Sequence, residues 1–205
     1  MSTKELRAYT FEVRAEQIEN KGRLTGRPIV YNSRTNLGFA DEIIEAGALN
    51  NADLRDVAFL VNHNLDMLPL ARSRNNNANS TMQMTVDNDG MEIRVDLDIT
   101  NNADAKALYS AVERGDIDGM SFMFTVDSDA WEDLESDHPT RIIKTIGRVF
   151  EVSAVTFPAY AATSISTRGI ADALDSARES LDSAHRAADA IKRQKQRIKM
   201  LTEVF

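Results

Sequence analysis

The pattern of apolar residues changes near residue 167 and divides the chain into two parts. Before this point, short apolar or alternating segments are separated by Gly, Pro and Asn, which is typical of strands joined by turns. Residues 170–205 contain neither Gly nor Pro, and their apolar residues recur at alternating spacings of four and three, as in a heptad seam. We therefore expect an α+β protein with a strand-rich body over residues 1–167 and a helical tail over residues 168–205. The seam, which Lys195 interrupts, consists of Ile170, Leu174, Ala177, Leu181, Ala184, Ala188, Ile191 and Ile198.

The most distinct element of the body is a hairpin. Residues 81–86 and 91–97 flank the turn sequence DNDG, and the second segment alternates apolar and polar residues, so that its apolar side chains share one face. Residues 103–114 predict a helix that ends at Gly115, with Ala107, Leu108, Ala111 and Val112 as its apolar stripe. Further strands are expected at 8–14, 28–31, 57–61, 121–126 and 141–157, with a break at Gly147 and an acidic loop over 127–137.

The composition argues against several classes of function. The formal net charge is −8, so broad binding to nucleic-acid phosphates is not expected. The absence of cysteine excludes disulfides, thiolate nucleophiles and thiolate metal sites. The acidic residues at 127–137 lack the spacing of a calcium loop, and we expect neither a metal nor another cofactor. No segment has the length and apolarity of a membrane span or a signal peptide, which predicts a soluble intracellular protein.

His63 is the histidine whose position best suits a general base. It follows the apolar run 57–61 and lies between Asn62 and Asn64. A side chain at the end of a buried strand is held rigidly and can still face a cleft, as proton transfer requires. The same position is also typical of a structural, hydrogen-bonded histidine. His138, in the acidic segment, and His185, in the tail, are expected to be exposed.

Ser121 is the candidate nucleophile. It begins a predicted strand directly after Gly119 and Met120, and a glycine before a serine allows close approach of a substrate backbone. Such a serine needs a base within hydrogen-bonding reach and a third group that orients the base. An ordinary serine at the start of a strand would give the same pattern.

Several separated segments carry a family resemblance. They are Gly26 with PIVYNS at 28–33, GFADEIIEAGAL at 38–49, DVAFLVNHN at 56–64, LAR at 70–72, RGDIDGMSFMF at 114–124 and FEVSAVTFPAY at 150–160. In this order, over roughly residues 8–166, they resemble the prohead proteases of tailed phages, which are akin to the herpesvirus assemblins. The resemblance implies a β-barrel-like serine protease body. Two departures are Met123 and Ala71, since the family often has Gly at both positions.

The resemblance also implies catalytic roles. His63 would be the general base, Ser121 the nucleophile, and Glu151 the group that orients the imidazole. In the assemblins the third member is a histidine, so His138 is the alternative. The donors of an oxyanion hole are not located by the sequence; we consider the backbone near Gly119 and Met120, the turn at Pro158, and Arg72 as a helper.

The implied function is the cutting of scaffold segments from the major capsid protein, and of the protease itself, inside the assembling procapsid in the host cytoplasm. We expect a homodimer or a higher assembly, with no membrane or nucleic-acid partner. The alternative from another class is a catalytically silent capsid-assembly or scaffold protein with the same fold. The seam of the helical tail has two interpretations under either function: a partner helix for another copy or for scaffold, which we favour, or a helix folded back onto the body. In the silent protein the tail would bind shell subunits.

Overall fold

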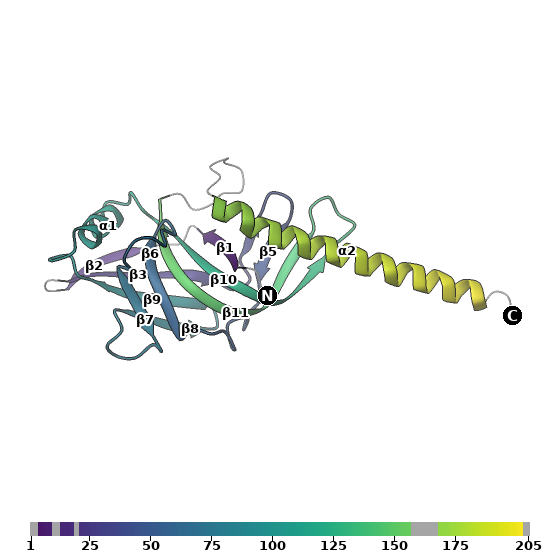
Figure 1. The fold of residues 1–205 in the computed structure, drawn as a ribbon, viewed down its shortest axis with the longest axis horizontal. Helices are drawn as coiled ribbons and strands as arrows, with labels where there is room; N and C mark the ends of the chain where they lie inside the picture. The colour runs from purple at the N-terminus through teal and green to yellow at the C-terminus, as the bar shows by residue number, and fades with distance from the viewer. Residues whose placement is uncertain (1–3, 10–12, 19–20, 157–167, 203–205) are drawn as a thin grey trace.

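A computed structural model of the chain describes residues 4–9, 13–18, 21–156 and 168–202. Strands dominate the body, and a long helix follows them, which confirms the expected α+β class (Figure 1). The helices are α1 (Ala103–Glu113) and α2 (Arg168–Thr202). The strands are β1 (Lys4–Tyr9), β2 (Arg14–Ile18), β3 (Lys21–Val30), β4 (Arg34–Asn36), β5 (Asp41–Ile44), β6 (Asp56–Val61), β7 (Ala71–Arg74), β8 (Met82–Asp87), β9 (Gly90–Leu97), β10 (Gly119–Glu132) and β11 (Thr140–Val155).

The strands form two sheets. The larger has seven strands in the order β1-β10-β11-β5-β4. In addition, β6 pairs with another stretch of β11, and β7 pairs with β6. Long β11 pairs antiparallel with β10 on one side. Its other side pairs in parallel first with β5 and then with β6. The consequence for function is that the end of β6 lies two strands away from β10, with β11 between them.

The smaller sheet has the order β2-β3-β9-β8 and shares one apolar core with the larger sheet. Buried side chains of β9, β10 and β11 all contribute to this core, which is the main source of stability. Neither sheet closes on itself over the residues that are described. The barrel-like body therefore consists of two open sheets packed together.

The hairpin predicted at residues 81–97 is confirmed as β8 and β9. Asp87 pairs with Gly90 at its turn, and the apolar residues of β9 are buried. Gly90 has a φ of 136°, and a Cβ atom there would lie 2.0 Å from the carbonyl oxygen of Ile29. Only glycine fits such a position without displacing backbone.

Three expectations about local structure are wrong. The acidic segment 127–137 is not all loop, because β10 continues to Glu132 and pairs with β11 throughout. Gly147 does not end β11, which runs on from Thr140 to Val155. The pairing with β10 does skip Gly147, because Thr125 is opposite Arg148 and Val126 is opposite Ile146, so the glycine forms a bulge within the strand. In α1 the buried positions are Ala105, Leu108, Tyr109 and Val112, whereas Ala107 is exposed.

α1 begins and ends as its sequence predicts. The Asn102 side chain accepts hydrogen bonds from the backbone N–H groups of Asp104 and Ala105, which caps the first turn. Gly115 follows the last turn with a φ of 77°. α1 packs on β2, β3 and β9.

α2 packs against β1 and β10 with its first half and extends away from the body with its second half (Figure 1). Ala177 is fully buried, whereas every described residue from 185 onward is exposed. The first half of the helix thus folds back onto the body. Docking of the exposed second half to a partner stays a prediction. Neither α1 nor the described part of α2 has the length and apolarity to cross a bilayer.

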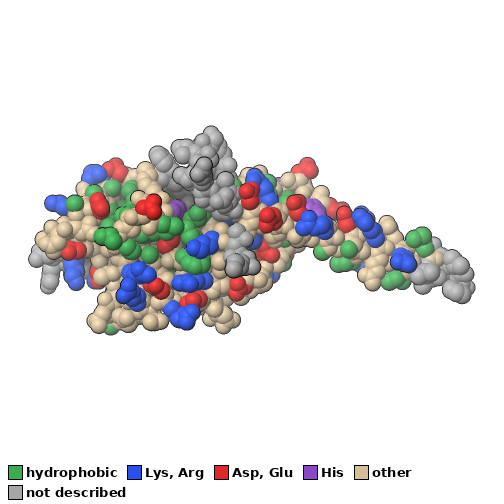
Figure 2. Space-filling model, viewed as in Figure 1, with side chains coloured by type: hydrophobic (Ala, Val, Ile, Leu, Met, Phe, Trp, Pro, Cys, Tyr) green, Lys and Arg blue, Asp and Glu red, His purple; other side chains and the backbone are tan. Residues whose placement is uncertain are grey.

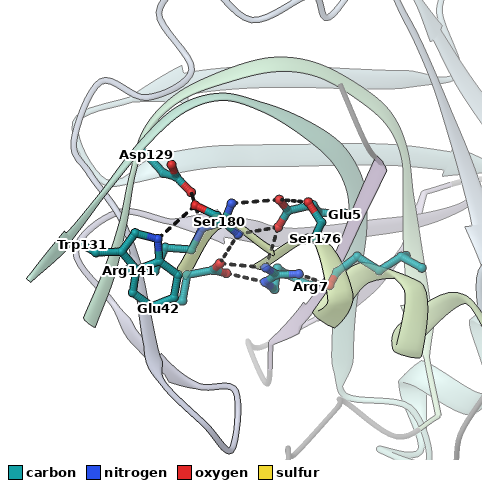
Figure 3. A network of polar contacts seen from close by, with 9 residues as sticks. Glu5, Arg7, Glu42, Asp129, Trp131, Arg141, Ser176 and Ser180 are labelled. Carbon is teal, nitrogen blue, oxygen red and sulfur yellow. Dashed lines mark hydrogen bonds and ion pairs between the residues drawn. The ribbon is translucent and has the colours of Figure 1, made fainter. Parts of the chain in front are cut away.

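A buried ion network fastens α2 and β1 to the body (Figure 3). Arg7 binds Glu42 through both carboxylate oxygens, and Arg141 binds Glu5 in the same way. Ser176 of α2 donates to Glu5 at 3.1 Å. Burial alone would raise the pKa of Glu42, but Arg7 and then Arg141 outweigh burial and hold the pKa below its usual value.

Candidate functional site

The site is centred on the turn that ends β6. β6 pairs in parallel with the last part of β11, so that Leu60 is opposite Ser153 and Val61 is opposite Ala154. Asn62 and His63 then leave the sheet with φ values of 50° and 56°, in the left-handed region. Asn adopts this conformation readily, whereas for a histidine it is unfavourable by roughly 1 kcal/mol. Residues with such strained backbone conformations are concentrated at functional sites.

The turn is held in this conformation by hydrogen bonds to the end of β11. The N–H of Asn62 donates to the carbonyl of Ala154 at 2.9 Å. The Asn62 side chain donates to Oγ1 of Thr156 and accepts from its N–H. The N–H of His63 donates to the hydroxyl of Ser153 at 3.1 Å. The imidazole therefore projects from a fixed backbone rather than from a mobile loop.

The His63 ring contacts Glu151 directly. Its Nδ1 lies 2.6 Å from Oε1 of Glu151. Glu151 is 1% exposed, and a buried carboxylate requires such a partner. With Nδ1–H donated to the carboxylate, the lone pair of Nε2 is left to accept a proton, which is the arrangement of a general base and its orienting acid.

Ser153 completes this contact and was missed at the level of sequence. Its hydroxyl donates to Oε2 of Glu151 at 2.5 Å and accepts the N–H of His63. One fully buried side chain thus fixes both the carboxylate and the backbone that carries the imidazole. The available signal was that residues 151 and 153 share one strand face, which places both side chains on the side of the histidine.

Ser121 lies on β10, directly opposite Ser153 on β11. Opposed residues of an antiparallel pair project to the same face with Cα atoms about 5 Å apart. Ser153 therefore has Ser121 as its neighbour on β10 and, through its hydroxyl, the backbone N–H of His63 in the turn after β6. In this state Oγ of Ser121 is buried and donates to the carbonyl of Arg7 at 2.7 Å. A hydroxyl has a single proton, so Ser121 can donate to another acceptor only when its side chain turns from Arg7.

Comparison with known proteins identifies the family of the chain. The family described as Caudovirus prohead serine protease matches residues 9–176. The chain belongs to this family of phage prohead proteases. Its members are serine proteases by that description, which agrees with the resemblance seen in the sequence segments.

Two individual proteins are similar to this member of the prohead protease family. The prohead protease of Enterobacteria phage HK97 is 28% identical over 162 residues, which cover 78% of this chain and 65% of that protein. The chain thus matches just under two thirds of the length of that relative. The bacteriophage T4 capsid assembly protease has 13% identity, a TM-score of 0.44, and coverage of 76% of this chain and 99% of that one.

Met123, where prohead proteases often have glycine, is directly opposite Glu151 on the neighbouring strand. It is 8% exposed and shares the face of Ser121. The departure from the family pattern therefore adds an apolar side chain beside the carboxylate. It removes no group of the candidate site.

The other residues predicted for the site lie away from His63 or are paired between β10 and β11. His138 precedes the first residue of β11, and its Nε2 lies 3.0 Å from Oδ1 of Asp41. Glu151 lies near the other end of β11. Arg72 is bound to Asp56 at the start of β6 through two hydrogen bonds of 2.7 Å. Gly119 and Met120 are paired within the β10–β11 ladder. Pro158 is outside the described residues. The structure thus brings together His63, Glu151 and the strand of Ser121, and leaves His138 and Arg72 apart.

Proposed function

We propose that this chain is a serine endopeptidase that removes scaffold segments from the major capsid protein, and trims itself, inside the assembling procapsid of a phage in the host cytoplasm. Membership of the prohead serine protease family supports this proposal. So does the name of its relative in phage HK97, a prohead protease. The observation that carries the residue assignment is the 2.6 Å contact of His63 with buried Glu151, one strand away from Ser121.

The proposed chemistry is acyl transfer. Nε2 of His63 takes the hydroxyl proton of Ser121, and Oγ of Ser121 forms a bond to the carbonyl carbon of the peptide. Glu151 holds the imidazole in the required tautomer and stabilises its positive charge. The imidazolium returns the proton to the leaving amine, and water then releases the acyl group by the same route. His63, Ser121 and Glu151 are sufficient for these proton transfers.

The oxyanion donors remain a prediction. Gly119 and Met120 directly precede the nucleophile on β10, where they are opposite Val155 and Ala154. An N–H group of theirs can bind an oxyanion only where it does not donate to the neighbouring strand. A donor of this kind contributes about 3 kcal/mol of transition-state stabilisation. Arg72, held by Asp56, is kept only as a helper in substrate binding.

The test is co-expression with the matching capsid subunit, with intact masses compared between wild type and Ser121→Ala. A subunit shortened by the wild type alone supports the proposal. An unshortened subunit with both proteins, in shells that still form, would contradict it and favour the alternative, a catalytically silent assembly protein. The basic, exposed second half of α2 would then be the surface to examine for shell binding.

A further inference from the structure

A hollow of about 500 Å³ lies beside the His63 turn. Asn62 and Asn64, the residues on both sides of His63, line one wall. Ile117, four residues ahead of Ser121 in the chain, lines another. The hollow therefore lies between the residues that flank the proposed base and the segment that leads into the nucleophile strand. Its volume is within the usual range of ligand sites.

The lining of this hollow is mainly aliphatic. Its apolar members are Val61, Met67, Ala107, Leu108, Ala111 and Ile117. The polar members are the two asparagines and Asp104, and no cationic side chain lines it. Such a surface favours an uncharged apolar side chain, since burial of apolar area is the main favourable contribution available there.

The surroundings are also apolar and exposed. Leu65 and Leu68, on the chain just after the His63 turn, are 64% and 85% exposed. Hydrophobic side chains gather on the face of the body near α1 and β6 (Figure 2). An exposed apolar patch continuous with a candidate catalytic site indicates contact with another molecule.

We infer that this hollow is the subsite that receives an aliphatic or aromatic side chain of the substrate peptide, within a few residues of the scissile bond. The inference rests on the proposed protease function and adds the substrate class to it. The occupant is a segment of a polypeptide rather than a free small molecule, because the hollow is lined both by the residues that flank His63 and by Ile117, on the segment that leads to Ser121. Leu, Ile, Met or Phe would fill it, whereas a charged side chain would be desolvated without a partner.

Ala107 gives a direct way to change the subsite. Its side chain is exposed at the wall of the hollow, so Ala107→Phe fills space without entering the core. Lys106, the preceding residue of α1, is also exposed and does not line the hollow. Lys106→Phe is therefore a matched control on the same helix.

The experiment uses the full chain co-expressed with the matching capsid subunit, and fragment masses locate the cut. We expect an apolar residue within three positions of the cut, and its change to Ala lowers cleavage by the wild type about tenfold or more. Ala107→Phe lowers cleavage of the natural subunit by a similar factor. This variant no longer distinguishes the apolar substrate residue from Ala at the same position. Lys106→Phe cleaves both subunits as the wild type does.

The possible failures are distinguishable. If the subunit is cut but Ala107→Phe leaves both rate and preference unchanged, or if only charged residues flank the cut, the subsite is wrong and the protease stands. If the wild type cuts nothing in shells that form, the protease proposal fails and the subsite fails with it.

Discussion

Glu151, near the end of β11, is bound to the imidazole of His63, whereas His138 is bound to Asp41 at the start of β11. We therefore expect Glu151→Gln to lower the rate of subunit cleavage by about 10³-fold or more, because the amide no longer selects the tautomer with a free Nε2. His138→Gln, the matched change, should leave the rate near that of the wild type. Equal losses in the two variants, or a larger loss in His138→Gln, would assign the third role to His138.

Ser153 is a positioning residue in this account. Removal of its hydroxyl in Ser153→Ala leaves Oε2 of Glu151 and the N–H of His63 without a partner, which costs about 1–3 kcal/mol of stability. We expect kcat for a peptide spanning the capsid cut to fall at least tenfold with KM little changed, because Ser153 is fully buried and acts through Glu151 and His63.

Ser73 offers the control for this prediction. It is equally buried, but its hydroxyl has no hydrogen-bond partner among the described residues. Ser73→Ala should therefore change neither kcat nor stability appreciably. A rate in Ser153→Ala equal to that in Ser73→Ala would show that Ser153 has no part in positioning the imidazole.

At the scale of elements, the turn that ends β6 determines where the imidazole points. Asn62 combines a left-handed backbone with two side-chain bonds to Thr156. Asn62→Gly removes the two side-chain bonds, but glycine adopts the left-handed conformation without strain. Asn62→Ala removes the bonds and also disfavours the left-handed conformation. We expect Asn62→Ala to be less stable than Asn62→Gly by about 1 kcal/mol and to cleave more slowly. Thermal unfolding and cleavage rates measure this, and the opposite order would show that the turn is not set by backbone strain.

The sequence predicts some elements much better than others. The β8–β9 hairpin, β6 and α1 follow from local alternation, a short apolar run and a capped amphipathic segment. The extension of β10 through the acidic residues to Glu132 was not predictable locally, because it depends on pairing with β11. His63 and Ser121 could be proposed from strand ends and family resemblance, but the role of Ser153 depends on register across three strands.

At the scale of the whole molecule, the buried ions join parts that are distant in sequence. Glu5, Arg7, Glu42 and Arg141 come from β1, β5 and β11, and α2 covers them (Figure 3). No sequence pattern links these positions, so the network was not predicted. Through Arg7, whose carbonyl accepts the Ser121 hydroxyl, it also bears on the resting position of the nucleophile.

Acid should weaken this network. The pKa of Glu42 is lowered in the folded chain, so its contribution is complete above the unfolded value of about 4.5 and is lost as the pH falls below it. We expect Glu42→Gln to unfold more easily by about 3–5 kcal/mol at pH 7, and the gap to the wild type to narrow below about pH 4.5. Denaturant unfolding at pH 7 and pH 4 measures the gap.

The control for the acid prediction is Glu135→Gln, at a fully solvent-exposed carboxylate. It should differ little from the wild type at either pH. A gap between the wild type and Glu42→Gln that stays constant or widens in acid would contradict the assigned direction of the Glu42 pKa.

The central claim is that Ser121 is the nucleophile of a protease served by His63 and Glu151. The most direct measurement is trapping of the full chain, recovered from assembling procapsids, with a fluorophosphonate, followed by peptide mass analysis. The account predicts one adduct, on Ser121 within the tryptic peptide 115–141, and none in His63→Ala. An adduct on another serine, or equal labelling in His63→Ala, would contradict it.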